Sequence, residues 1–579
     1  MSRSTTSDTR IVHLQTNQRD AVPPSKEGSV DAPKSTAVQS FFLIVNNVAD
    51  GSPMQVLLLT APPTCSLSPH HKPRLHHHQI SMRTFTLCAM LAIASAISIS
   101  PIVIKGNKFF NSTSGQQFYI VGVDYQPSDS TDPLNLQGLQ RDVPAMVALG
   151  VNTIRVYQSS SSADHTAAMN YLADNGIYVL VDATDPNFSI NSAYPSWNLD
   201  IFNGIKAKID NFIGFPNLLG FLGGNEVVNS NAETIAAAYV KAAVRDIKAY
   251  IKSKGYSIPV GYAATDVDAN FDLQQYLNCD SRDNSIDFYG LNTYRYCGDV
   301  AFNETSYTDL VRDFSSYSAP FTFTEYGCNQ VSPRVFREVD SIYGPNMDYF
   351  LSGGFVYEWS QEANNYGLVN ISPDGSSISV TQDFKNLMGR LANINPDRTS
   401  LTAYNGSTST VNACPAYNAD TFNSQSYPLP PTPDDTVCSC LNSQLACTTF
   451  YQNATLAYAN ATYLNYIAQD VNFVCSSNAS FCEAISSNSA TAKYGMYSGC
   501  NSLQRAAYVL NQYYQAYKES YGDIACTGFQ SSKLVTPSAN CPNGIVAPTD
   551  ADTSVTGLRK NLRTLRPKQL SQHRRIHSA

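Results

Sequence analysis

Two glutamates stand where short apolar segments of the sequence end. The segment 221–226 reads Phe-Leu-Gly-Gly-Asn-Glu and ends on Glu226, and the segment 321–327 reads Phe-Thr-Phe-Thr-Glu-Tyr-Gly and carries Glu325. Two carboxyl groups can cleave a glycosidic bond, because one protonates the departing oxygen while the other attacks the anomeric carbon. A lone Asn-Glu pair is a weak signal, because Glu226 could merely form a salt bridge. A catalytic role therefore requires a fold that brings Glu226 and Glu325 together.

Histidine is nearly absent from the body of the chain. Six of the nine histidines precede residue 82 and two lie in the last seven residues, which leaves His165 alone between them. Ser-His-Asp hydrolases and zinc sites with several histidines both need imidazole. We therefore expect carboxylates, amides and tyrosines to carry the chemistry, with no metal and no other cofactor.

A regular scaffold is predicted for residues 102–395. Short apolar, β-branched or aromatic runs alternate there with longer helical stretches such as 232–252. The expected strands are 118–125, 153–157, 176–183, 218–226, 258–265, 286–294, 321–327 and 353–360. Eight strands that alternate with helices predict an α/β fold, the (β/α)8 TIM barrel. The active site of such a barrel lies at the C-terminal ends of the strands, where Glu226 and Glu325 end the fourth and seventh expected strands.

Charge argues against a nucleic-acid partner. The two ends of the chain, 1–83 and 559–579, hold 15 of the 38 basic residues and 5 of the 46 acidic ones, so the body between them is strongly acidic. Such a surface repels phosphates. The basic tail could touch phosphate or anionic lipid, but a solvated disordered end explains it as well.

A second domain follows a Pro-rich stretch. Residues 427–433 read Tyr-Pro-Leu-Pro-Pro-Thr-Pro and predict a stiff linker. Eight cysteines come after it, at positions 438, 440, 447, 475, 482, 500, 526 and 541. This density predicts a small module stapled by disulfides, because so small a core needs covalent help. A zinc cluster is the alternative, which the lack of histidine disfavours.

Several features indicate secretion. Residues 82–100 have a basic start, an apolar run of about a dozen residues and then small residues, as a signal peptide has. We expect translation to start at Met82 and residues 1–81 to be a disordered or wrongly joined extension; a signal anchor with a cytoplasmic arm is the rival reading. Twelve of the fourteen cysteines remain when Cys65 and Cys88 are set aside, an even number that suits disulfides in an oxidising compartment. Eight Asn-X-Ser/Thr sequons are compatible with N-glycosylation: Asn111, Asn187, Asn303, Asn370, Asn405, Asn453, Asn460 and Asn478.

The sequence resembles a known family. The matching motifs are Gly-Val-Asp-Tyr-Gln (122–126), Gly-Val-Asn-Thr-Ile-Arg-Val-Tyr (150–157), Gly-Asn-Glu (224–226), Gly-Leu-Asn-Thr-Tyr (290–294), Thr-Glu-Tyr-Gly-Cys-Asn (324–329) and Glu-Ala-Asn-Asn-Tyr-Gly-Leu-Val (362–369). They resemble the fungal cell-wall β-1,3-glucanosyltransferases of glycoside hydrolase family 72. The segment that begins Cys438-Ser-Cys-Leu resembles the carbohydrate-binding module of family 43, which implies a small, disulfide-rich and mainly helical module. The resemblance spans about residues 102–545.

The resemblance implies a role for each candidate residue. Glu226 would be the general acid/base and Glu325 the nucleophile, and Asn225 would bond the sugar 2-hydroxyl or position the carboxylates. The glucan groove would be lined by Gln126, Tyr157, Tyr294 and Tyr357. Tyrosines suit this role because the ring offers an apolar face and the hydroxyl a hydrogen bond. Packing explains Tyr366 and Glu358 as well as sugar contact does.

The implied domain organisation has six parts. These are an extension (1–81), a signal peptide (82–100), the catalytic barrel (102–395), a connecting segment with the linker (396–437), the glucan-binding module (438–545) and a basic disordered tail (546–579). The resemblance also implies disulfides Cys297–Cys328, Cys279–Cys414 and Cys475–Cys482.

The implied reaction takes β-1,3-glucan as both donor and acceptor. A monomeric, retaining enzyme would cleave an internal bond and transfer the new reducing end to the non-reducing end of another glucan, at the cell surface or in the wall. An endo-β-1,3-glucanase and a non-catalytic glucan-binding wall protein are the alternatives.

Two family features are missing. A cysteine pair common in the family is absent near 137–144 and 164–172. Without this disulfide, the local stability of the chain around these two regions is in doubt. Members are often held to the membrane by a lipid, but the C-terminal residues give no anchor signal.

Overall fold

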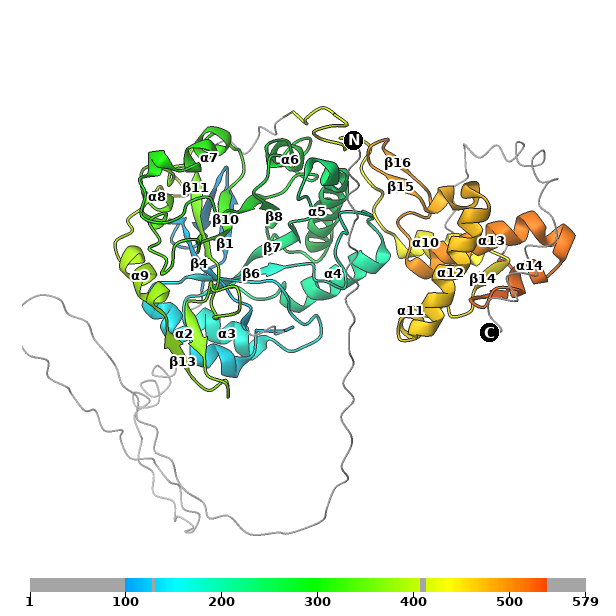
Figure 1. Cartoon of the computed structure of the whole chain (residues 1–579), viewed down its shortest axis with the longest axis horizontal. Coiled ribbons are helices and arrows are strands. Elements are labelled where there is room, and N and C mark those ends of the chain that lie inside the picture. The colour runs from blue at the N-terminus through cyan, green and yellow to red at the C-terminus, as the bar shows by residue number, and fades with distance from the viewer. Residues whose placement is uncertain (1–98, 128–130, 407–412, 539–579) are drawn as a thin grey trace, which may run out of the picture. The chain divides into compact units, whose positions relative to one another are not determined.

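The computed structural model describes residues 99–127, 131–406 and 413–538 (Figure 1). The expected extension, nearly all of the signal segment, Cys541 and the basic tail lie outside these residues. Within the described ranges, no helix combines the length and the apolar character needed to cross a membrane.

A closed barrel of eight parallel strands confirms the predicted TIM-barrel fold. Its strands are β4 (Ile120–Asp124), β5 (Thr153–Val156), β6 (Tyr178–Asp182), β7 (Leu218–Asn225), β8 (Val260–Thr265), β9 (Phe288–Asn292), β10 (Phe321–Tyr326) and β11 (Leu351–Val356). Consecutive strands pair in parallel, and β11 closes the barrel on β4, with Gly353 opposite Ile120. Seven strands lie inside the expected segments; β11 begins two residues before its segment and ends four residues early.

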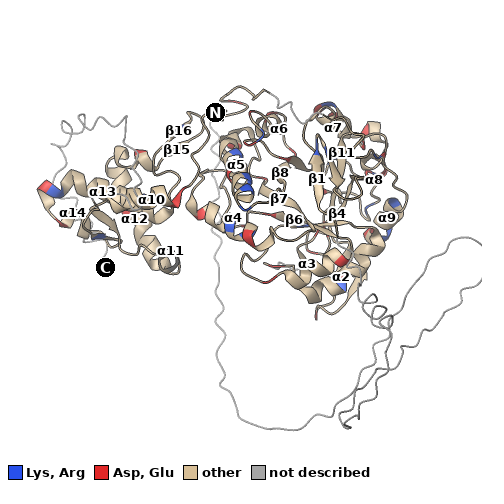
Figure 2. Ribbon diagram, turned by 180° about the vertical axis from the view of Figure 1, so that it is seen from behind, with Lys and Arg blue, Asp and Glu red and all other residues tan. Residues whose placement is uncertain are grey.

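Helices follow most of the barrel strands. They are α2 (Leu136–Leu149), α3 (Thr166–Asp174), α4 (Leu199–Phe212), α5 (Ala237–Ser253), α6 (Asn270–Leu277), α7 (Tyr307–Phe314), α8 (Val339–Ile342) and α9 (Gln382–Leu391). The helix expected over 232–252 starts instead as a 3-10 helix, η2 (Asn231–Ala236), and then continues as α5. Charged residues gather on such helices, as the blue bands of α5 show in Figure 2, and the strands are mostly apolar.

Large rings fill the barrel interior where the neighbouring strand carries glycine. The Cβ of any larger residue at Gly261 would stand 2.5 Å from the Phe288 ring, far inside van der Waals contact. Phe288 in turn meets Phe109, with ring centroids 5.8 Å apart. Phe109 belongs to a small antiparallel sheet, β1 (Ile102–Lys105), β2 (Lys108–Asn111) and β3 (Gln117–Phe118), which precedes the barrel. This sheet joins the apolar cluster of the barrel interior, so the barrel is a packed core rather than a channel.

The cysteine-rich segment is mainly helical, as predicted. Its elements are α10 (Asp435–Ser443), β14 (Cys447–Thr449), α11 (Ala454–Tyr458), α12 (Ala461–Ser477), η4 (Ala479–Ile485), β15 (Ser487–Asn488), β16 (Lys493–Tyr494), α13 (Ser502–Tyr521), α14 (Ile524–Thr527) and β17 (Ser532–Leu534). The disulfides Cys438–Cys500, Cys447–Cys526 and Cys475–Cys482 staple it. The last pair was expected, and so were Cys279–Cys414 and Cys297–Cys328 of the larger domain, which the structure also contains.

The contact between Gly261 and Phe288 predicts a stability loss. Gly261→Ala should destabilise the protein by about 1–3 kcal/mol, because the new methyl group overpacks the barrel interior. Thermal denaturation followed by circular dichroism measures the change.

Gly389→Ala is the matched control. Gly389 lies in α9, and apart from its chain neighbours and the backbone of that helix no described atom lies within 4 Å of the added methyl group, so the change should be neutral or stabilise by up to about 1 kcal/mol. Equal melting temperatures for Gly261→Ala and the wild type would contradict the packing argument.

Candidate active site

One side-chain amide joins the two predicted glutamates. The Nδ2 of Asn292, at the end of β9, donates to Oε1 of Glu226 at 2.8 Å and to Oε1 of Glu325 at 3.0 Å. Two oxygens at these distances from one nitrogen cannot be more than about 5.8 Å apart. Retaining glycosidases hold their carboxyl groups about 5–5.5 Å apart, whereas inverting ones need about 6.5–9.5 Å to admit a water. The pair therefore has the spacing of a retaining site.

The orientation of the Asn292 amide is itself fixed. Thr324, one residue before Glu325, donates its hydroxyl to Oδ1 of Asn292 at 2.7 Å. With the carbonyl oxygen taken up in this bond, the NH2 group must face the carboxylates. Strands β9 and β10 pair in parallel, with Asn292 opposite Glu325, so the sheet register places donor and acceptor side by side.

A buried arginine also donates a hydrogen bond to Glu325. Arg155 in β5 is fully buried and donates from Nη1 to Oε1 of Glu325 at 3.1 Å. The same guanidinium binds Asp182 in β6 through Nε and Nη2, both at 3.1 Å. Four strands therefore meet at this cation, since Asn225 at the end of β7 also accepts from it at 2.8 Å.

Two tyrosine hydroxyls complete the surroundings of Glu325. Tyr157 donates to Oε1 at 2.9 Å and Tyr294 donates to Oε2 at 2.7 Å. Burial raises the pKa of both phenols far above the ordinary value, so both stay protonated and act as donors. Glu325 thus accepts hydrogen bonds on both oxygens, which prevents the carboxylate from rotating.

The pKa of Glu325 reflects opposing causes. Burial raises it above the usual range for a glutamate, and the nearby Glu226 carboxylate raises it further. The Arg155 charge and the hydrogen bonds from Tyr294 and Tyr157 lower it. The net pKa of Glu325 is raised, and the cation and the two hydroxyl donors oppose the effect of burial by favouring the ionised form.

Glu226 sits on an unusual backbone. Its φ of 49° lies in the left-handed region, which side chains other than glycine seldom adopt. Its amide donates to the carbonyl of Ala263 in β8 at 2.8 Å. The next two amides, of Val227 and Val228, donate to the hydroxyl of Tyr262. These bonds turn the chain sharply after β7 and leave the Glu226 side chain partly exposed beside the buried Glu325.

The remaining predicted residues gather around this pair. Asn225 accepts from Asn292 at 3.1 Å as well as from Arg155. The side-chain oxygen Oε1 of Gln126 accepts from the backbone amides of Tyr157 and of residue 158, which fixes the loop after β5. Tyr357 packs edge-on against Tyr294, with ring centroids 6.2 Å apart.

The two weaker candidates are also near. The Tyr366 ring packs against Tyr294 and Tyr357 at 5.6 and 5.2 Å, so the three form one aromatic wall. Glu358 is buried and accepts from Asn364 at 2.6 Å. Burial raises the pKa of Glu358 to about 7.

Sequence reasoning missed Arg155, Asp182 and Asn292. A charged residue inside the expected strand 153–157 was a signal, because an arginine buried in a barrel needs carboxylates as partners. Asn292 belongs to the motif at 290–294. Its contacts with the two glutamates follow from the register of β9 on β10, which the sequence does not give.

Known families and proteins match both domains of this chain. Residues 91–395 match the glucanosyltransferase family, glycoside hydrolase family 72, and residues 456–531 match the X8 domain. Protein EPD1 of Candida maltosa is 40% identical over 457 residues, which are 77% of this chain and 80% of that protein. The 1,3-beta-glucanosyltransferase gas1 of Schizosaccharomyces pombe is 36% identical over 474 residues, 80% of this chain and 83% of that protein.

A solved structure is similar as well. Gas2p of Saccharomyces cerevisiae, in complex with laminaritriose and laminaritetraose, is 35% identical and superposes with a TM-score of 0.68. The match covers 76% of this chain and 98% of that one.

Loss of the Arg155 charge should change both rate and pH dependence. Arg155→Met removes the cation that lowers the pKa of Glu325, so this carboxylate would take up a proton at a higher pH than in the wild type. The acid limb of the kcat/KM pH profile should therefore shift to higher pH. We expect kcat/KM for a laminari-oligosaccharide to fall about 100-fold or more, since Glu325 also loses its alignment.

Arg312→Met serves as control. That arginine side chain is 68% exposed, and its ion pairs within the described ranges are with neighbouring aspartates on α7, so both the rate and the pH profile should stay those of the wild type. An Arg155→Met profile that keeps the wild-type acid limb would contradict the electrostatic role.

Proposed function

Since the chain belongs to the glucanosyltransferase family, glycoside hydrolase family 72, we propose that it is a retaining β-1,3-glucanosyltransferase. The observation that carries the proposal is the Asn292 amide shared by Glu226 and Glu325, which limits the gap between the two carboxylates. That gap admits a direct attack on the anomeric carbon and is too small for the interposed water of an inverting enzyme.

The first step forms a covalent intermediate. Glu325, ionised and held by donors on both oxygens, attacks the anomeric carbon of an internal β-1,3-glucan bond. Glu226, the more exposed of the two, gives its proton to the departing glucan oxygen. The products are a glucosyl ester on Glu325 and a released glucan fragment.

The second step returns the enzyme to its starting state. Glu226, now ionised, takes the proton of a non-reducing-end hydroxyl on a second glucan chain. That oxygen attacks the anomeric carbon, the new glycosidic bond forms, and Glu325 leaves as a carboxylate. Two displacements restore the β configuration.

The wall of Tyr294, Tyr357 and Tyr366 suits a sugar ligand. Aromatic faces and edges pack on the C–H groups of a pyranose, and hydroxyls bond its OH groups. Transfer requires that the acceptor outcompete water, which binding beside such a wall favours. The same carboxylates with poor acceptor binding would give an endo-β-1,3-glucanase, the alternative function.

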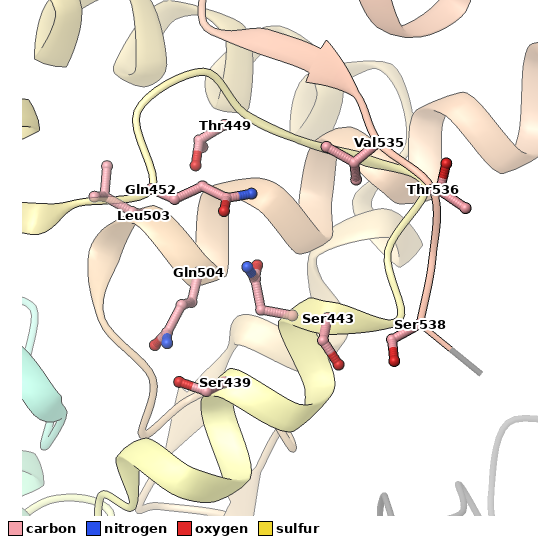
Figure 3. A pocket seen from close by; sticks show the side chains of 10 residues that line it. Ser439, Ser443, Thr449, Gln452, Leu503, Gln504, Val535, Thr536 and Ser538 are labelled. Atoms are coloured by element: carbon pink, nitrogen blue, oxygen red, sulfur yellow. The ribbon is translucent and has the colours of Figure 1, made fainter. Parts of the chain in front are cut away.

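The cysteine-rich second domain would bind the same polysaccharide. A cavity of about 470 Å³ lies between α10, the start of α13 and the chain after β17 (Figure 3). Its lining is uncharged: Ser439, Asn442, Ser443, Thr449, Gln452, Leu503, Gln504, Val535, Thr536 and Ser538. Oδ1 of Asn442 is buried and accepts no hydrogen bond from the described residues. Amides and hydroxyls beside two apolar side chains match a neutral sugar better than an ion.

The site of action would be the cell surface or the wall. Disulfides in both domains indicate an oxidising compartment. Donor and acceptor are then wall glucans, with the enzyme either released, retained in the wall or attached to the membrane by a lipid.

Product size distinguishes the candidate functions. Incubated with a reduced laminari-oligosaccharide, the protein should yield products longer than the substrate. Only shorter products would mean hydrolysis, and an unchanged substrate would mean a binding protein. Glu325→Gln should abolish turnover and keep glucan binding, because the amide cannot attack; near-wild-type turnover of this variant would refute the nucleophile assignment.

The cavity of the second domain predicts a separate loss of binding. In the inactive Glu325→Gln protein, Asn442→Leu should weaken retention on insoluble β-1,3-glucan about tenfold, because it removes a buried acceptor for a sugar hydroxyl. Gln515→Leu, at an exposed position of α13, is the control and should bind as before. Equal retention of all three proteins would exclude the cavity as a glucan site.

A further inference from the structure

Arg334 is a second buried arginine of the barrel domain, and the mechanism above does not use it. It lies between β10 and α8 and is 2% exposed. Its Nε donates to Oδ2 of Asp383 at 2.6 Å, and its backbone amide donates to Oδ1 of the same carboxylate at 3.0 Å. Asp383 lies in the first turn of α9, so one carboxylate both neutralises the cation and fixes the backbone that carries it.

The other donors of this guanidinium bind three backbone carbonyls. Nη1 donates to the carbonyl of Tyr357 at 2.6 Å and to that of Gly327 at 3.2 Å, and Nη2 donates to the carbonyl of Tyr366. Gly327 lies two residues after Glu325, and Tyr357 directly follows β11. Arg334 therefore joins the chain after the nucleophile to the two segments that carry the outer part of the tyrosine wall.

The guanidinium also contacts the wall through a ring. Its central carbon lies 5.5 Å from the centroid of the Tyr366 ring and 4.7 Å from that of Phe336. A guanidinium over an aromatic face is attracted by the π-electrons of the ring. Arg334 thus binds Tyr366 at both its carbonyl and its ring, and Tyr366 in turn packs against Tyr294 and Tyr357.

This set of acceptors suits an arginine and not a lysine. A guanidinium presents five N–H groups in a rigid planar fork, whereas an ammonium presents three on a single nitrogen. Four acceptors surround Arg334, namely the carboxylate of Asp383 and the three carbonyls. A lysine would keep the charge beside Asp383 but would leave carbonyls without their donor.

The nucleophile is held by other groups. Four side chains donate to the carboxylate of Glu325, from β5, β9 and the residues just after these strands, and Arg334 is not one of them. Loss of the Arg334 fork would therefore leave the attacking carboxylate aligned while it loosened the surface on which the sugar packs.

We propose that Arg334, anchored by Asp383, is a positioning residue for glucan binding, which fixes Tyr357 and Tyr366 relative to each other and to the nucleophile. It determines the affinity for glucan separately from the chemistry at Glu325. The inference rests on the proposed function, because it takes the tyrosine wall as the sugar-binding surface.

Arg334→Lys tests the proposal by keeping the charge and removing the fork. The KM for a laminari-oligosaccharide should rise about tenfold, the loss expected for hydrogen bonds to a charged group, while kcat stays within about threefold of the wild type. KM is taken from the consumption of the oligosaccharide, so it is obtained whether the products are longer or shorter. Simple loss of folded protein would lower kcat at an unchanged KM, and that result would overturn the proposal.

Asp383→Asn loosens the same anchor without touching the three carbonyl contacts. It should raise KM in the same direction by about two- to threefold, and an unchanged KM would count against the anchor. Arg390→Lys is the matched control on α9, because Arg390 binds the carbonyl of Val335 and the carboxylate of Asp340, neither of which belongs to the wall. Its KM and kcat should stay those of the wild type, and melting temperatures check that all variants fold.

The wall itself supplies the sharpest comparison. In a protein with Tyr357→Ala and Tyr366→Ala, KM should already be raised, and adding Arg334→Lys should raise it less than about twofold further, because the rings that Arg334 positions are gone. A further tenfold rise, or an unchanged KM after the two tyrosine substitutions, would overturn the proposal. The product sizes of the wild type test the proposed function instead, so either idea can fail while the other stands.

Discussion

A single buried cation, Arg155, is the constraint on which the site depends. A guanidinium in a barrel interior is costly unless carboxylates and further acceptors satisfy it. Here its partners come from β6, β7 and β10, which the chain supplies 27, 70 and 170 residues further on. The closed barrel brings these strands to one point. Closure of the sheet therefore supplies the partners that Arg155 needs, and the bonds to Arg155 in turn stabilise the closed sheet.

The Asn292 amide adds the second constraint, on distance. Arg155 fixes where Glu325 lies, and Asn292 fixes how far Glu226 lies from it. Thr324 in turn fixes the amide, so the spacing of the carboxylates follows from the register of β9 on β10 rather than from either glutamate alone. The left-handed backbone at Glu226 is a further consequence, since the chain must turn at once to bring that side chain above its partner.

The sequence predicted the parts of this arrangement that are local. Runs of β-branched and aromatic residues located all eight strands, and the sequence alone placed the two glutamates at strand ends. The expected strand began at Gly353, two residues late, because Leu351 joins the sheet by pairing with Phe321 of β10, a partner that the local sequence does not reveal. The helix expected from residue 232 begins as a 3-10 turn, which apolar periodicity does not distinguish from α-helix. Arg155, Asp182 and Asn292 could not be assigned, because their partners are set by strand order and register; the resemblance to family 72 supplied motifs but not these contacts.

The central claim is that Glu325 forms a covalent bond to glucose, with Glu226 close enough to assist. Trapping tests it most directly: a laminari-oligosaccharide activated with fluoride and carrying fluorine at the 2-position should leave a stable sugar ester, located by mass spectrometry of the digested protein. The account predicts the added mass on the peptide that contains Glu325, at that residue. A label on another carboxylate, or turnover without a label to a product of inverted configuration, would contradict it.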